Sequence, residues 1–161
     1  MKSKVASFLG IAVMAFGVVS CSSDDESSTK NNNKLVGKWT MTEEQALDSK
    51  GKVLEKFVEY NGVCPLDNAE YLAGGIMKSS YYNYSEIVTN CQASIEDGTW
   101  KVEGNKLNLG VVAEGLESDA VYTITELDEG IMLLDMPLSR YDLEDYPENT
   151  VTIRSVFKKA K

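Results

Sequence analysis

The sequence contains no histidine among its 161 residues, and this restricts the chemistry that its side chains can perform. Ser-His-Asp triads, Cys-His pairs, zinc sites of the His-Glu-x-x-His type and imidazole general bases are all excluded. Acid–base catalysis, for example on sugars, would have to use carboxylates such as Asp142, Glu144 and Asp145. These stand beside Pro147 in a polar, loop-like segment without the spacing and central glycine of a calcium loop. We therefore predict a protein that is not an enzyme and has no intrinsic cofactor or metal site.

The amino-terminal segment has the features of a bacterial secretion signal. Lys2 and Lys4 precede a largely apolar run over residues 5–19, and Ser20 then precedes Cys21. The run is shorter than the ~20 apolar residues that span a bilayer, and two glycines interrupt it. The end of the segment resembles the lipobox of bacterial lipoproteins, which implies cleavage before Cys21 and acylation of this residue. Two or more acyl chains anchor a protein durably without spanning the membrane.

The residues that follow Cys21 predict a flexible tether. Residues 22–33 contain no apolar side chain, so they cannot offset the entropy of ordering their backbone. A flexible chain of this length reaches about 20 Å. The acidic run at residues 24–26 resembles an export signal for the outer face of the outer membrane, and an ordinary linker at the periplasmic face is the alternative. We expect a lipid-anchored protein of the outer membrane, displayed at the cell surface.

The charge of the chain excludes one class of partner. Removal of the signal peptide, residues 1–20, takes two lysines and changes the formal net charge from −9 to −11. Such a protein repels nucleic acid and anionic lipid headgroups, so we exclude nucleic-acid binding and assign membrane contact to the acyl chains alone. The acylated cysteine and tether occupy residues 21–33. Residues 34–161 have the length of a single domain, without a second linker or an internal repeat.

The remaining cysteines, Cys64 and Cys91, form an even pair in a domain that we expect to be exported. Because the compartment beyond the inner membrane is oxidising, the pair predicts a disulfide. The chain-entropy estimate for a loop of this size is a stabilisation of ~3.5 kcal/mol. A reactive thiol pair or a metal site is the alternative, although two cysteines are too few ligands for a closed soft-metal site.

The hydrophobic period of the domain is mainly two residues, which predicts strands. Trp100 and Val102 alternate with charged residues, and after a Gly-Asn turn Leu107 and Leu109 continue the alternation, as in a hairpin with one buried face. Similar patterns predict further strands over residues 36–43, 52–60, 70–73, 76–84, 122–124, 131–136 and 151–158. Helix is a local competitor only over residues 41–48. We expect an all-β domain, an antiparallel up-and-down β-barrel of about eight strands, because closure removes exposed edges.

In the last of these strands, Val151, Ile153 and Phe157 are expected to share one face. Arg154 falls on the opposite face by the same alternation. We expect this strand to be the closing strand of the barrel.

Several short motifs over residues 34–158 resemble the lipocalin-like family of bacterial lipoproteins. They are Leu35-Val36-Gly37-Lys38-Trp39, which matches the Gly-x-Trp opening of lipocalins, the pair Cys64 and Cys91, Gly98-Thr99-Trp100 with its hairpin, and the closing segment Thr150-Val151-Thr152-Ile153. Glycine permits close backbone approach where a barrel closes, and the Trp39 indole can plug that end. The resemblance implies that an arginine of the last strand packs across Trp39. Arg154 is the residue that can take this place.

The resemblance also implies non-catalytic binding of a small apolar or amphipathic ligand inside the barrel. The candidate ligand-binding residues are Trp39, Trp100, Leu109 and Tyr122. Such a site requires an apolar cavity of roughly 300–1,000 Å³ with a few inward polar groups.

The alternative is a structural or interaction lipoprotein whose loops bind a protein or glycan partner. The interior of an eight-stranded barrel is barely wide enough for its own side chains, so the barrel could be filled. Tyr81, Tyr82 and Tyr84 are then the candidate contact surface, because tyrosine provides a large contact area at low entropic cost. Alternate tyrosines in a strand are also typical of half-buried cross-strand pairs. The sequence leaves the ligand and the oligomeric state open.

Overall fold

The computed structural model describes residues 31–58, 63–85, 89–113, 116–138 and 145–161. The predicted signal peptide, Cys21 with its predicted acylation and the predicted tether up to residue 30 lie outside the described residues. Within the described part, no helix is long and apolar enough to cross a membrane. Almost all of it is antiparallel β-sheet, as predicted.

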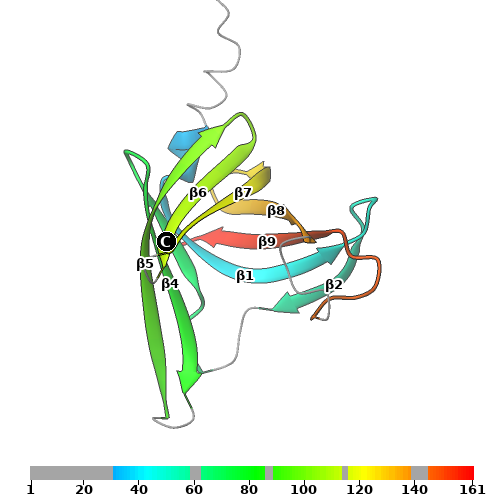
Figure 1. Cartoon of the computed structure of the whole chain (residues 1–161), viewed down its shortest axis with the longest axis horizontal. Coiled ribbons are helices and arrows are strands. Elements are labelled where there is room, and N and C mark those ends of the chain that lie inside the picture. Colours follow the sequence, from blue (N-terminus) through cyan, green and yellow to red (C-terminus); the bar gives the residue numbers. More distant parts are fainter. Residues whose placement is uncertain (1–30, 59–62, 86–88, 114–115, 139–144) are drawn as a thin grey trace, which may run out of the picture.

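Nine strands form one sheet in the described part of the chain. They are β1 (Gly37–Leu47), β2 (Val53–Val58), β3 (Asn68–Leu72), β4 (Ile76–Ser85), β5 (Asn90–Glu103), β6 (Lys106–Ala113), β7 (Leu116–Leu127), β8 (Ile131–Pro137) and β9 (Thr152–Lys159). From β3 to β9 each strand pairs with the next, and β9 pairs with β1 (Figure 1). The predicted barrel of eight strands is confirmed, with β2 as one additional strand.

Strand β1 pairs with three other strands and thereby closes the barrel. Along one edge, Gly37–Thr40 pair with β3 and Glu43–Leu47 pair with β2. The other edge pairs with β9 over nearly its whole length. This double pairing explains why the segment over residues 41–48, where helix competed locally, is extended: hydrogen bonding on both edges outweighs a weak helix propensity.

A β-bulge in β1 changes which side chains face the barrel interior. The pairing of β1 with β9 shifts register between Met41 and Glu43, so that Thr42 is an extra residue in the ladder. Before the bulge the interior residues are Trp39 and Met41, and after it Glu44 faces inward. Strict alternation along the sequence would instead have directed Glu43 to the interior.

One end of the barrel is filled by a continuous hydrophobic core. Its buried members are Leu35, Trp39, Ala69, Tyr71, Met77, Trp100, Val102, Leu107, Ile124, Met132 and Leu134. A helical turn over residues 31–35 adjoins this end, and the Asn31 side chain donates a hydrogen bond to the carbonyl of Gly104 in the β5–β6 turn (3.3 Å). The turn begins within the predicted tether, so residues 31–33 belong to the folded structure rather than to a disordered linker.

The last strand differs from the prediction at its start. β9 begins at Thr152, and Val151 is 44% exposed, whereas Ile153 is buried. The backbone amide of Val151 donates to the carbonyl of Leu47 (2.9 Å), and its carbonyl accepts from the amide of Leu138 (3.0 Å). Val151 therefore lies in the connection that enters β9, and its expected place on the buried face was wrong because the strand's alternation does not extend to it.

Candidate functional site

A cavity of about 230 Å³ lies inside the barrel next to the hydrophobic core. Its described lining residues are Met41, Glu44, Asp67, Asn68, Ala69, Tyr71, Met77, Ser79, Tyr81, Leu109, Ala120, Tyr122, Leu134, Ser155 and Phe157. Pockets for drug-sized ligands occupy roughly 300–1,000 Å³, whereas an apolar cavity of about 150 Å³ already holds benzene. The cavity is therefore smaller than we expected from the sequence and has room for a molecule of roughly one ring with a short substituent.

Small side chains on four strands leave this space open. Ala69 on β3, Ser79 on β4, Ala120 on β7 and Ser155 on β9 all face the cavity. The serines are 5% and 7% exposed, so they are buried polar groups in a largely apolar wall. Larger apolar residues at these positions would complete the core, and the barrel would then have no internal cavity.

Two of the four candidate ligand-binding residues line the cavity, Leu109 on β6 and Tyr122 on β7. Trp39 and Trp100 are not among its described lining residues. The indole of Trp39 is fully buried and donates a hydrogen bond to the carbonyl of Leu35 (2.7 Å). Its N–H is therefore used within the packed end of the barrel, and its assignment to the ligand site was wrong.

Trp100, on β5, is also fixed by hydrogen bonds from its indole N–H to backbone carbonyls. Its indole nitrogen donates to the carbonyls of Leu72 (3.0 Å) and Ile76 (2.9 Å), at the turn that joins β3 to β4. Its ring meets the Tyr71 ring edge to face, with 5.9 Å between centroids. Trp100 thus ties β5 to the β3–β4 hairpin and supports Tyr71, which does line the cavity.

The packed end is closed by Gly37, Trp39 and Lys159. Gly37 has a φ of +128°, a backbone conformation that favours glycine, and a Cβ atom there would also lie 2.9 Å from Cε of the flexible Lys159 side chain. The Lys159 ammonium lies 5.0 Å from the centroid of the Trp39 ring and donates to the carbonyl of Lys34 (2.9 Å). This cation–π contact covers the end of the barrel.

Arg154 does not pack across Trp39 as the resemblance implied. In the β1–β9 ladder Trp39 is opposite Lys159, whereas Arg154 is opposite Gln45. The Arg154 guanidinium forms a two-pronged ion pair with Asp135 on β8 (2.7 and 2.8 Å), which raises its pKa. The prediction was wrong because alternation along β9 places Lys159, but not Arg154, on the face that carries Ile153 and Phe157, and register then sets Lys159 beside the indole.

Two carboxylates in the cavity wall were not expected from the sequence. Glu44 faces inward because of the bulge at Thr42, and its Oε1 accepts a hydrogen bond from the Tyr146 hydroxyl (2.8 Å). The Tyr146 ring packs edge to face against Phe57 on β2, with 5.6 Å between centroids. Asp67, just before β3, is the second carboxylate. Because a bulge leaves no clear mark in a hydrophobic pattern, sequence reasoning could not have found Glu44.

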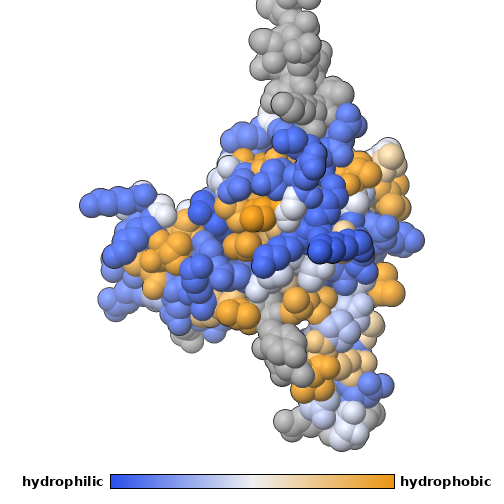
Figure 2. All heavy atoms as spheres, turned by 180° about the vertical axis from the view of Figure 1, so that it is seen from behind, coloured by the Kyte–Doolittle hydropathy of each residue, from blue (hydrophilic) through white to orange (hydrophobic). Residues whose placement is uncertain are grey.

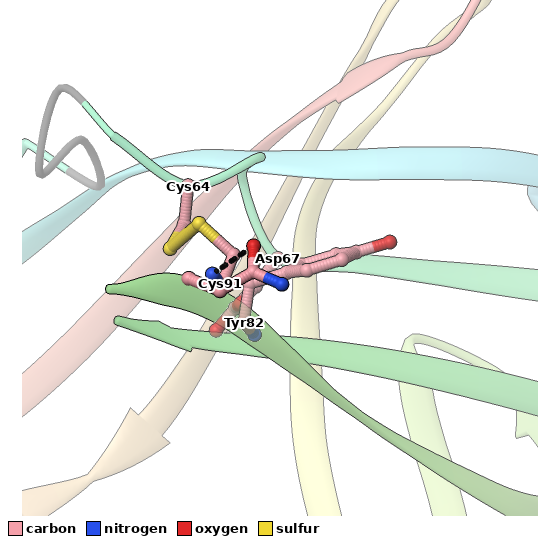
Figure 3. The surroundings of a disulfide bond; sticks show 5 residues. Cys64, Asp67, Tyr82 and Cys91 are labelled. Atoms are coloured by element: carbon pink, nitrogen blue, oxygen red, sulfur yellow. Dashed lines mark hydrogen bonds between the residues drawn. A yellow bond between two sulfur atoms is a disulfide. The ribbon is translucent and has the colours of Figure 1, made fainter. Parts of the chain in front are cut away.

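A disulfide joins Cys64 to Cys91 at the start of β5, which confirms the predicted pairing (Figure 3). The Asp67 carboxylate lies close by and accepts a hydrogen bond from the backbone amide of Tyr82 on β4 (2.8 Å). The disulfide and this hydrogen bond together fix the segment before β3 across the β4–β5 hairpin. They hold Asp67 at the cavity wall.

Two tyrosines in the wall, Tyr71 and Tyr81, remain protonated at neutral pH. Burial raises the pKa of Tyr71 far above its usual value, and the neighbouring Tyr122 and Tyr81 add to this. Burial also raises the pKa of Tyr81, against the effect of a hydrogen bond with Ser79, and the negative charges of Glu96 and Asp67 raise it further. Both phenols therefore offer neutral aromatic rings and hydroxyl groups.

The three tyrosines of β4 do not form one surface. Tyr81 lines the cavity and is 40% exposed, so it lies where the cavity meets solvent. Tyr82 and Tyr84 occupy the opposite face by alternation, with Tyr82 half-buried and Tyr84 41% exposed. The predicted contact surface of Tyr81, Tyr82 and Tyr84 is thus divided between the two faces of the sheet.

The carboxylates considered for catalysis lie mostly outside the described residues. Asp142 and Glu144 fall within residues 139–144, which the structure does not describe, whereas Asp145 is described and is exposed. In the part of the chain that the structure describes, no three Cys, Asp or Glu side chains come together in a way that could hold a metal ion.

Comparisons with known proteins identify similar sequences and folds. The family model described as Lipocalin-like domain matches residues 35–134. A lipocalin-like protein from Bacteroides uniformis shares 14% identity and a TM-score of 0.48, over 79% of this chain and 99% of its own. An uncharacterized protein from Bacteroides eggerthii shares 16% identity and a TM-score of 0.46, over 78% and 99%. Lobster apocrustacyanin A1 shares 15% identity and a TM-score of 0.48, over 84% and 66%. Among curated proteins, none matches this chain.

Proposed function

The chain belongs to the lipocalin-like domain family, and from this premise we propose that it is a lipid-anchored binding protein of the outer membrane, exposed at the cell surface. It holds a small apolar or amphipathic molecule inside its barrel and does not catalyse a reaction. Lipocalin-like domains are generally ligand-binding barrels, which supports the general function. The observation that carries the proposal for this chain is the internal cavity of about 230 Å³.

The lining of the cavity supports ligand binding rather than a packing defect. Binding sites for small molecules combine a mostly apolar wall with a few convergent polar groups. Here Leu109, Leu134 and Phe157 supply apolar surface, while Ser79 and Ser155 supply buried hydroxyl groups. A void that formed only through imperfect packing would be expected to be apolar throughout.

The position of the first described residues supports the proposed anchoring. Asn31 contacts the β5–β6 turn at the packed end of the barrel, where Trp39 and Lys159 also lie. An amino-terminal lipid anchor would therefore attach at the packed end. Such an arrangement leaves the part of the barrel that contains the cavity accessible to the medium.

Replacement of Leu109 by Trp tests the binding function. The larger side chain would occupy the cavity, so we expect it to abolish retention of a small molecule by the barrel. Native mass spectrometry of the protein after incubation with an extract of its growth medium gives the measurement. Overpacking of a filled core costs ~1–3 kcal/mol, and we expect a smaller loss of unfolding free energy because the ring enters empty space.

Val121→Trp is the matched control for this experiment. Val121 lies on β7 beside the cavity-lining Ala120 and Tyr122, but it is 46% exposed. A tryptophan there should leave ligand retention unchanged. Failure of the unmodified protein to retain any small-molecule mass, together with a large destabilisation by Leu109→Trp, would reject the binding function.

Replacement of Cys21 by Ala tests the anchor. Without this thiol no thioether to lipid can form, so the protein should no longer fractionate with membranes. Mass spectrometry of the amino-terminal peptide of the unmodified protein should detect acyl mass on Cys21. An amino-terminal peptide that begins before residue 21, or that carries no acyl group, would contradict the anchoring proposal.

A second candidate function, binding of a protein or glycan partner by the outer surface, is favoured by one observation. Tyr84 on β4 and Ile95 on β5 are 41% and 69% exposed. Figure 2 shows hydrophobic side chains interspersed with polar ones on the lower lobe of the view, which the β4–β5 hairpin forms. If the cavity proves unable to bind a molecule, this surface becomes the better candidate site.

A further inference from the structure

We propose that the molecule held in the cavity is a small organic cation, an apolar or aromatic body that carries an ammonium group, and that Glu44 is its charge partner. This inference rests on the proposed binding function and specifies the ligand class of the same site.

The described part of the cavity wall carries negative charge. Glu44 and Asp67 are the charged side chains among its described lining residues, and no lysine or arginine is among them. An enclosed surface with charges of one sign attracts a ligand of the opposite sign and raises its local concentration. An anionic ligand, such as a fatty acid, would meet two carboxylates without a compensating base.

The surroundings of Glu44 also favour a cationic ligand. Its side chain is half-buried, and the partner that the described residues provide is the neutral hydroxyl of Tyr146 at 2.8 Å. The neighbouring Glu43, on the outer face of β1, has a lysine partner instead, with Lys56 at 2.9 Å. A carboxylate withdrawn from water is stabilised by a cation, and the described residues supply one to Glu43 but not to Glu44.

The aromatic rings of the cavity wall favour a cationic ligand as well. Tyr71, Tyr81, Tyr122 and Phe157 all contribute to the wall. The face of an aromatic ring attracts a cation within about 6 Å of its centroid, and the attraction increases when the cation is removed from water. The chain itself uses this interaction at the packed end, where the Lys159 ammonium lies 5.0 Å from the Trp39 centroid. The cavity combines similar rings with carboxylates but has no described cation of its own.

A set of three probes of the same shape tests the charge of the ligand. Phenethylamine, phenethyl alcohol and phenylacetate share one ring and a short chain, and they differ in carrying a positive, a neutral or a negative group. Their dissociation constants are measured by NMR titration of the chain from position 21 onward, with Cys21→Ala to prevent acylation. We expect phenethylamine to bind about tenfold or more tightly than the alcohol, as one charge-assisted contact predicts, and phenylacetate to bind weakest.

Two variants locate the charge that is responsible. Glu44→Gln retains the shape and an acceptor for the Tyr146 hydroxyl, and it should reduce the affinity for phenethylamine to that for the alcohol. Glu43→Gln removes the same charge one residue away on the outer face, and it should leave all three affinities unchanged. The three probes are also compared on protein that carries only Cys21→Ala. This comparison tests whether the cavity prefers a cation even if Glu44→Gln fails to fold.

Benzene, as a small neutral probe, separates this inference from the proposed function. If benzene and phenethyl alcohol bind, and the amine binds no better than the alcohol, the cavity is a binding site and the cationic ligand is rejected. If neither benzene nor any member of the set binds, the cavity is inaccessible and both proposals are overturned. An equal loss of amine binding in Glu44→Gln and Glu43→Gln would also reject Glu44 as the specific partner.

Discussion

The two ends of the barrel use their interior side chains in opposite ways. At the packed end, Leu35, Trp39 and Leu107 are fully buried, and Lys159 covers the indole. In the cavity half, small residues such as Ala120 leave space, and the charged groups among the described lining residues are carboxylates. The cation at one end completes the packing around an aromatic ring, whereas the carboxylates at the other end have no described cationic partner.

This difference indicates that one part of the sheet stabilises the fold and another part leaves space for the cavity. Large apolar side chains stabilise a barrel in proportion to the surface that they bury, and the packed end contains most of them. A half-filled interior forgoes part of that stabilisation, and its buried serines and half-buried glutamate add desolvation costs. Proteins retain such features mainly at functional sites, so the stabilising core and the proposed binding site occupy different parts of the same barrel.

The largest expected effect is at the packed end. Trp39→Ala should reduce the free energy of unfolding by ~3–5 kcal/mol, because it removes a fully buried indole that the surrounding strands cannot replace. Chemical denaturation followed by circular dichroism gives the measurement. Leu109→Ala, which removes a side chain that already borders the cavity, should cost less than ~2 kcal/mol. Equal losses for the two variants would show that the ends are not differently packed.

A smaller effect is expected from the disulfide beside the cavity. Reduction of Cys64–Cys91 should lower the free energy of unfolding by ~2–4 kcal/mol without abolishing the fold, because the unfolded chain gains entropy while the packed end is unchanged. It should also weaken binding of any ligand that depends on Asp67, which the disulfide helps to position.

Denaturant midpoints with and without reductant test the stability effect, and thiol titration of the denatured, unreduced protein tests the bond itself. Cys64→Ala with Cys91→Ala serves as a control for side effects of the reductant. Two reactive thiols per molecule, in protein that carries Cys21→Ala and was produced in an oxidising compartment, would be incompatible with the disulfide.

The smallest effect is expected from the cation that covers Trp39. Lys159→Met keeps much of the aliphatic stem but loses the cation–π contact and the hydrogen bond to Lys34, and it should cost ~1 kcal/mol. Lys158→Met removes the same charge from an exposed neighbouring position and should have almost no effect. Thermal unfolding of both variants provides the measurement. A cost that is equal for the two lysines would mean that the contact with the indole contributes nothing specific.

Part of the fold could be predicted because its signals are local. Alternation in the segments around Trp100 and Leu107 indicates a hairpin whatever the rest of the chain does, and the even pair Cys64 and Cys91 indicates a disulfide once export is expected. Leu109 and Tyr122 were correctly expected inside the barrel, and both line the cavity. Periodicity identifies the face on which a residue lies, but it does not distinguish a packed interior from an open one.

The placement of cations and carboxylates required the pairing of distant strands. Register between β1 and β9 sets Lys159 rather than Arg154 against Trp39. A single bulged residue, Thr42, turns Glu44 toward the cavity. A shift of one residue reverses the face of every following side chain, so no local pattern could have indicated the inward position of Glu44. For β9, alternation gives the face of each residue, but only the register shows that Lys159 lies opposite Trp39.

The sequence by itself therefore determined the all-β class, the closed antiparallel barrel, the disulfide and the absence of imidazole chemistry, since each depends on residue type or short-range spacing. Only the tertiary structure decided that a hydrophobic core fills one part of the barrel, that a cavity lies next to this core, and that two carboxylates line the cavity. The volume of a cavity is the small difference between the space that eight strands enclose and the side chains that they contribute. That difference depends on register, bulges and rotamers together, and it exists only once all the strands have been assembled.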